Sequence, residues 1–287
     1  MAKPERSFSP LWLAWLMWGL VAVFYCIGFF QRMAPAVIAD DLMRDFTLDG
    51  ALLGNLSAMY FYAYAAMQIP TGLLVDQIGA RRLASIACLI AAAGILIFSF
   101  GSSLWLAYVG RFLVGASVAV AWVTCMKLAG HWFPANRFAT VTGMALLLGN
   151  LGGIMAGVPL AVGVDLFGWR AMMGVSGFLT LLLAVVTWLT LRDDPSEYGF
   201  KSHAHLVVQN HGSLPVGAAL KSVMTRKDTW LLFFGGGLST APVLVFAGLW
   251  GVPYLTQVYH LKTSQAALMT STMLLSLALS GPVCGAI

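Results

Sequence analysis

The sequence predicts an all-α protein, a polytopic transmembrane helical bundle. Of its 287 residues 60% are hydrophobic and only 9% are charged, whereas charged residues make up about a quarter of a typical soluble domain. The apolar residues also form long runs, and one helix needs roughly 20 mostly apolar residues to cross a bilayer. Eight runs qualify as spans: 11–38, 51–75, 83–101, 104–127, 138–163, 170–191, 230–256 and 265–287.

The basic residues indicate how this bundle is oriented. With a cytoplasmic N-terminus, eleven of the 16 Lys and Arg residues fall in cytoplasmic segments, three fall in outer loops and two lie inside runs. Cytoplasmic loops of membrane proteins carry such an excess. We therefore expect an integral protein of the plasma membrane, the inner membrane of a bacterium, in contact with the lipid bilayer. The net charge of +5 reflects this topology and does not indicate a nucleic-acid partner.

The runs divide into two groups. The first run, 11–38, is too long for the apolar region of a signal peptide, so we interpret it as a spanning helix. Six runs with short loops form an N-terminal bundle over 1–191. A polar stretch containing Pro195 and Pro215 gives a cytoplasmic connector over 192–229, and 230–287 holds two more helices. The four cysteines lie in apolar runs without metal-ligand spacing, so we expect neither a metal site nor a cofactor.

The stretch GLLVDQIGARR, residues 72–82, lies in the cytoplasmic turn after the second run. Gly72 is expected to let a neighbouring helix approach, and Gly79 permits a tight turn. Asp76 is placed to meet a basic group or a helix N-terminus. Arg81 and Arg82 hold the turn on the cytoplasmic side.

This stretch resembles the G-x-x-x-D-R/K-x-G-x-R/K-R/K signature of the major facilitator superfamily, with Gln77 replacing a basic residue. Four further stretches resemble the same family: RFLVG (111–115), HWFPANRFATVTG (131–143), FGWRAM (167–172) and DDPSEYGF (193–200). The resemblance implies twelve spans in two bundles around a central cavity, with the 72–82 cluster acting as a latch between the halves. The chain ends about where a second copy of the motif is expected, so we expect a C-terminally truncated chain.

Two arginines lie inside the predicted spans. Arg32 and Arg111 are each about 10–12 Å below the outer surface at 1.5 Å per residue, where a charge costs about 2.5–3.5 kcal/mol on insertion scales. None of the eleven acidic residues falls in the middle of a span. Because paired arginines suit carboxylate or phosphate, we expect a small organic anion to bridge them.

Helical spacing adds aromatic residues to this expected substrate site. Tyr25 and Phe29 share a face with Arg32, and Tyr108 and Trp122 share a face with Arg111. They would form an aromatic wall with hydroxyl groups.

Two structural alternatives to this anion site stay open. In one, Arg32 extends outward toward Asp40 or Asp41. In the other, Arg111 packs against backbone carbonyls.

Within the family, the anion:cation symporter branch resembles this arrangement most. Several proton-coupled members of that branch carry an acid where this chain has Gln31, and a second where it has Val118. The coupling ion, a proton or sodium, therefore stays open. A small-residue stripe in 138–163 is expected to face a similar one in 265–287 as a gate between the halves. The members of the two stripes are Gly149, Gly153 and Gly157, and Thr272, Ser276 and Ser280.

Three functions remain open from the sequence. The first is a secondary transporter of a small organic anion that works by alternating access. The second is a drug-type efflux antiporter, although Ile154 stands where that branch has a proline in GNLGGIMAGVP, residues 149–159. The third is a non-transporting or truncated relative. An enzyme is disfavoured, because no catalytic triad, metal set or phosphate-binding loop falls within one site.

Overall fold

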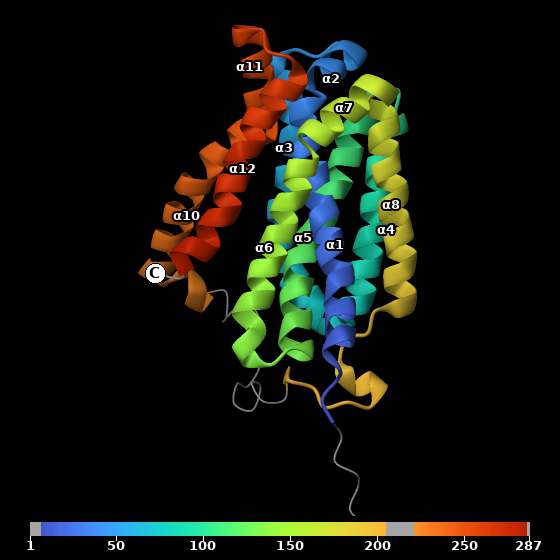
Figure 1. Cartoon of the computed structure of the whole chain (residues 1–287), viewed down its shortest axis with the longest axis vertical. Helices are drawn as coiled ribbons and strands as arrows, with labels where there is room; N and C mark the ends of the chain where they lie inside the picture. The colour runs from blue at the N-terminus through green and yellow to red at the C-terminus, as the bar shows by residue number, and fades with distance from the viewer. Residues whose placement is uncertain (1–6, 205–220, 286–287) are drawn as a thin grey trace, which may run out of the picture.

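The computed structural model describes residues 7–204 and 221–285 (Figure 1). Every regular element in these residues is helical, which confirms the all-α expectation. The α-helices are α1 (Leu11–Val37), α2 (Ala39–Phe46), α3 (Gly50–Ile78), α4 (Ala80–Phe100), α5 (Leu104–Trp132), α6 (Phe138–Met155), α7 (Val158–Phe167), α8 (Trp169–Thr190), α10 (Lys227–Val245), α11 (Gly251–Tyr259) and α12 (Thr263–Gly285). Short 3₁₀ or π segments are η1 (Ala135–Arg137), η2 (Pro195–Tyr198) and η4 (Phe246–Trp250).

Six helical stretches of the described residues are long and apolar enough to cross a membrane. They are α1, α4, α5, α8, the stretch Ala135–Phe167 and the stretch Lys227–Tyr259. Helix α3 has 29 residues and α12 has 23, so both have the length of a span. The count of eight spans stays a prediction.

Helix α5 is the centre of the first group and packs against α1, α3 and α4. Glycine makes two of the closest helix contacts in this group possible. An ideal Cβ on Gly115 of α5 would lie 2.1 Å from the backbone oxygen of Tyr60 in α3. An ideal Cβ on Gly152 of α6 would lie 2.0 Å from the backbone oxygen of Cys26 in α1. Any larger residue at either position would therefore push two helices apart.

The end of the bundle where α1 begins is rich in basic residues and is called the basic end. These residues are Arg81, Arg82, Lys127, Arg137 and Arg192. The far end carries the short helix α2 and the turn between α7 and α8 (Figure 1). The buried apolar residues form one cluster nearer each of these ends.

The predicted span 138–163 is divided in the structure. Helix α6 ends at Met155, and α7 begins at Val158. Gly157, between them, has φ −86° and ψ −115°, which is not a helical conformation. Pro159 near the start of α7 has no N–H to continue the α6 ladder. The glycine positions of this span therefore do not lie on one continuous helix.

Helices α10–α12 contact the first group at the far end. Helix α1 packs against η4 and α11, while α12 packs against α6 and α7. Toward the basic end, α10 and α12 lean away from α6 (Figure 1). The side chains of α10 there are exposed, with Leu231 at 72% and Leu232 at 77%. Among the described residues, the two groups of helices thus meet toward the far end and diverge toward the basic end.

Candidate functional site

Arg32 and Arg111 converge on one aromatic ring. Arg32 of α1 is 7% exposed and Arg111 of α5 is 1% exposed. The guanidinium carbons lie 5.3 Å and 5.0 Å from the ring centroid of Tyr60 in α3, which is fully buried. The two arginines found in the sequence are therefore neighbours, and a tyrosine that the sequence did not single out lies against both.

Arg32 is held by α1 and α3. Its Nε donates a hydrogen bond to the Tyr60 hydroxyl over 3.0 Å. Its guanidinium carbon lies 4.5 Å from the centroid of Phe29 and 4.8 Å from that of Tyr64, distances typical of cation–π contacts. Its Nη2 is buried and has no hydrogen-bond partner among the described residues.

The alternative in which Arg32 extends outward is wrong, because its contacts are with these rings. Asp41 pairs instead with Arg44 of α2.

Arg111 is fixed to α1. Its Nη1 donates to the backbone oxygen of Gln31 over 2.8 Å, so the predicted alternative of a backbone-bonded arginine holds for this group. Its Nε and Nη2 are buried and have no partner among the described residues. An unpaired buried donor costs about 1–3 kcal/mol, and more when it is charged. The arrangement therefore favours an added acceptor, and an anion most of all.

The predicted aromatic wall forms only in part. Tyr25 contacts both Phe29, at 4.8 Å between centroids, and Trp122, at 5.5 Å. Of these three, Phe29 alone makes a cation–π contact with Arg32 in the described residues. In the described part of the chain, Tyr108 makes no cation–π contact with either arginine. It contacts the ring of Trp105, which is 75% exposed.

Tyr60 and Tyr64 occupy positions i and i+4 of the stretch YFYAY, residues 60–64. That spacing places them on one face of a helix, which is the signal that points to them in the sequence.

Gln31 is a second residue whose role the sequence did not predict. It is fully buried, and its Nε2 donates to the hydroxyl of Thr180 in α8 over 3.1 Å. Its backbone oxygen accepts from Arg111, so this residue connects α1 to both α5 and α8. Its Oε1 has no partner in the described part of the chain.

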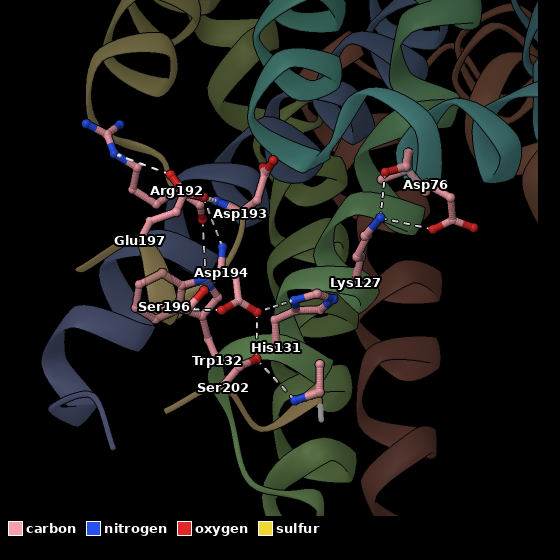
Figure 2. A network of polar contacts seen from close by, with 12 residues as sticks. Asp76, Lys127, His131, Trp132, Arg192, Asp193, Asp194, Ser196, Glu197 and Ser202 are labelled. Carbon is pink, nitrogen blue, oxygen red and sulfur yellow. Dashed lines mark hydrogen bonds and ion pairs between the residues drawn. The ribbon is translucent and has the colours of Figure 1, made fainter. Parts of the chain in front are cut away.

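The predicted latch makes two contacts at the basic end. Asp76 meets a basic group, because its carboxylate lies 2.9 Å from Nζ of Lys127 (Figure 2). Lys127 also donates to the backbone oxygen of Val75 over 2.6 Å. The backbone N–H of Arg81 donates to the Asp193 carboxylate, which joins the start of α4 to the connector.

The glycines and arginines of the latch differ in their surroundings. Gly79 has φ +84°, and an ideal Cβ there would lie 2.1 Å from Oδ2 of Asp193. At Gly72 a Cβ would meet nothing within 4 Å, so the expected close helix approach is absent from the described structure. The side chain of Arg81 donates to the backbone oxygen of Trp188 over 2.9 Å, whereas Arg82 is exposed.

The start of the connector is fastened to α5 through Asp194 (Figure 2). Its carboxylate accepts from the backbone N–H of Ser196 over 2.8 Å and from the Ser202 hydroxyl over 2.6 Å, and it lies 2.8 Å from Nδ1 of His131. Burial alone would raise the pKa of Asp194, but these hydrogen bonds outweigh burial and lower that pKa to about 2. A cavity of about 590 Å³ beside this network is lined by Lys127 and His131 among others.

The predicted gate is corrected on the α6–α7 side. Gly157 faces α12, since an ideal Cβ there would lie 2.2 Å from Oγ of Ser271. Gly153 also faces α12, with Leu274 at 3.1 Å. Gly149 faces α1 instead, where a Cβ would lie 2.6 Å from the Tyr25 ring. The glycine stripe therefore serves two different neighbours.

The α12 side of the gate lies on a different face from the predicted one. Thr272 and Ser276 are exposed and donate to carbonyls of their own helix. The side chain of Ser280 lies outside the described residues. The face of α12 that contacts Gly157 carries Ala267 and Ser271. Neighbouring side chains on a helix point about 100° apart, so Thr272 does not share this face with Ser271.

No group of three or more His, Cys, Asp or Glu in the described residues could hold a metal ion. The arginine pair is the candidate site, because its buried, unpaired N–H donors suit an anion.

Comparison with known proteins identifies the family of the chain. The model of the Major Facilitator Superfamily matches residues 12–287. A probable sulfoacetate transporter of Cupriavidus necator is 24% identical over 262 residues, which cover 90% of this chain and 61% of that protein. The D-galactonate transporter of Escherichia coli O6:H1 is 23% identical over 290 residues, which cover 96% of this chain and 67% of that protein.

Among solved structures, a bacterial homolog of the human lysosomal transporter Spinster, inward-facing and unoccupied, matches with a TM-score of 0.72. It is 19% identical, and the match covers 96% of this chain and 60% of that chain, so it supports the fold alone. The chain thus spans 60–67% of the length of these three proteins. With its family model matched over nearly its whole length, this chain belongs to the Major Facilitator Superfamily.

Proposed function

We propose that this chain supplies the anion-binding part of a secondary transporter that moves a small organic anion by alternating access. The observation that carries the proposal is the state of Arg32 and Arg111. Both are buried, both keep unpaired N–H donors, and no carboxylate in the described residues contacts either one. The names of two relatives add support, because sulfoacetate and D-galactonate both carry a carboxylate.

The arrangement of the helices supports the transport part of the proposal. In the proposed division, residues 1–191 form the first bundle, 192–229 the cytoplasmic connector, and 230–287 the first helices of a second bundle. The two groups meet at the far end and diverge toward the basic end, as expected of one state of a rocking pair. The basic end is proposed to be cytoplasmic, following the excess of Lys and Arg there.

A coupling proton is proposed to bind away from positions 31 and 118 of the first bundle. The side chains of Gln31 and Val118 cannot carry a proton, and Gln31 is already bonded to Thr180. A coupling proton would therefore bind elsewhere in the complete pathway.

The proposal is tested by anion binding to the purified protein. Calorimetric titration with D-galactonate and sulfoacetate should give saturable binding, which Arg32→Gln weakens at least tenfold. Arg32→Lys keeps the charge but loses the planar fork, so it should retain part of the affinity. Arg137→Gln removes an exposed arginine that belongs neither to the latch nor to the anion site, and it is the matched control, with binding unchanged.

Two results would contradict the anion site. If Arg32→Gln binds D-galactonate and sulfoacetate as tightly as the wild type does, Arg32 is not part of the anion site. Binding of lipophilic cations in place of both anions would favour the efflux antiporter.

A further inference from the structure

Tyr60 is an uncharged residue placed between two cations. Its ring centroid lies 5.3 Å from the guanidinium carbon of Arg32 and 5.0 Å from that of Arg111. Two positive charges so close repel each other, and no carboxylate of the described residues contacts them. The face of an aromatic ring is electron-rich and attracts cations. The ring therefore reduces a repulsion that an acidic residue would otherwise have to balance.

The position of this ring is fixed from two sides. Gly115 lets the backbone of α3 approach α5 at Tyr60, where an ideal Cβ would lie only 2.1 Å from the Tyr60 oxygen. The ring of Tyr64 lies parallel to that of Tyr60, with 6.0 Å between centroids and 12° between planes. Because side chain and backbone are both packed, Tyr60 is a rigid support for the two arginines.

The Tyr60 hydroxyl makes the two arginines unequal. The side-on edge of a guanidinium carries the N–H groups of Nε and Nη2. The Tyr60 hydroxyl accepts from Nε of Arg32, so one of the two groups on that edge is occupied. Arg111 is bonded to Gln31 through Nη1, which leaves its side-on edge, Nε and Nη2, without a partner. Such an edge matches the two oxygens of a carboxylate. Nη2 of Arg32 is also buried and has no partner in the described structure.

We propose that Tyr60 is a positioning residue of the anion site. Its ring separates the two guanidiniums and its hydroxyl fixes Arg32, so that Nη2 of Arg32 and the side-on edge of Arg111 remain for one substrate carboxylate. This inference rests on the proposed function. It adds a residue that acts through Arg32 and Arg111.

The test compares three tyrosine variants by calorimetric titration of the purified full chain with D-galactonate. Tyr60→Phe keeps the ring and removes the hydroxyl, and it should bind about tenfold more weakly, the loss expected for one hydrogen bond to a charged group. Tyr60→Leu also removes the ring and should bind more weakly still. Tyr62→Phe removes an exposed hydroxyl from the same helix and should bind as the wild type does.

A double-mutant cycle separates positioning from packing. If Tyr60 acts through Arg32, Tyr60→Phe should change affinity less than twofold when Arg32 is already lysine. An equal loss in both backgrounds would show a packing role and overturn the inference. If Tyr60→Phe does not fold, a fluorinated tyrosine at position 60, whose hydroxyl is a weaker acceptor, should lower affinity in the same direction.

The remaining outcomes distinguish this inference from the function on which it rests. Unchanged affinity of Tyr60→Phe, with binding still lost in Arg32→Gln, would overturn the positioning role and leave the anion site intact. If the wild type binds neither D-galactonate nor sulfoacetate, the proposed function fails and the role of Tyr60 fails with it.

Discussion

Replacing Gly115 with alanine should separate α3 from α5. The new Cβ would lie 2.1 Å from the Tyr60 backbone oxygen and 2.8 Å from its carbonyl carbon. An ordinary carbon–oxygen contact is about 3.3–3.6 Å, so α3 would have to move by about 1.2–1.5 Å. The clashing atoms belong to the backbone of a packed helix and cannot rotate away.

The size of the effect follows from two opposing contributions. Overpacking of a well-packed interior costs about 1–3 kcal/mol. Alanine in a helix gains up to about 1 kcal/mol over glycine. We therefore expect Gly115→Ala to lower the free energy of unfolding by up to about 2 kcal/mol. It should also weaken anion binding, because Tyr60 moves with α3.

The assay is unfolding in mixed micelles, followed by circular dichroism, with Gly130→Ala as the matched control. Gly130 lies in the same helix, and a Cβ there would meet nothing within 4 Å. That variant should be stabilised by about 0.5–1 kcal/mol. Both variants carry the same Gly→Ala gain in helix propensity, so the difference between them reports the packing contact alone. If Gly115→Ala were as stable as Gly130→Ala, the close approach of α3 and α5 would be refuted.

Three further predictions concern the basic end. Gly79→Ala should cost about 1–2 kcal/mol, seen as a lower melting temperature, because φ is +84° and Asp193 is adjacent. Asp76→Lys combined with Lys127→Asp should recover the roughly 0.2–1 kcal/mol lost in either single variant at low salt. The pKa of Asp194 is lowered to about 2, so its contribution to stability should be complete above the unfolded pKa of about 3.9 and lost as pH falls toward 2. Asp194→Asn should abolish that dependence in acid melting curves.

The ends of the first span were predictable from the residues that flank it. The run 11–38 corresponds to α1, Leu11–Val37, because the proline before it and the acidic residues after it mark its ends. The division at Gly157 was not predictable in the same way. The stretch GGIMAGVP stays apolar through the break, and hydropathy does not respond to backbone conformation.

The same distinction applies to the candidate site. Arg32 and Arg111 stand out because a charge within an apolar run is rare and costly. Tyr60 does not stand out, because aromatic residues are common in such runs and Tyr62 and Tyr64 are close by. Which tyrosine faces the arginines depends on the rotation of α3 about its axis, and packing against α5 sets that rotation.

The face of α12 was missed for a related reason. Small residues occur on adjacent faces of that helix, one through Ala267 and Ser271 and another through Thr272 and Ser276. Spacing of four residues fits either face, so the periodicity does not select between them. The neighbour does select, because Gly157 leaves room for the side chain of Ser271.

The arginine site links stability to binding. Its unpaired donors, Nη2 of Arg32 and Nε and Nη2 of Arg111, cost free energy as long as no acceptor is present. An anion that supplies the acceptor would remove that cost and add its own attraction to both charges. Anion binding should therefore raise the free energy of unfolding of the bundle by more than the area of the anion's contacts suggests, because the free protein carries the cost of the unpaired donors. The close contacts at Gly115 and Gln31 keep the two arginines from turning toward other acceptors. Such a movement would remove the cost of the unpaired donors, but it would also abolish the anion site.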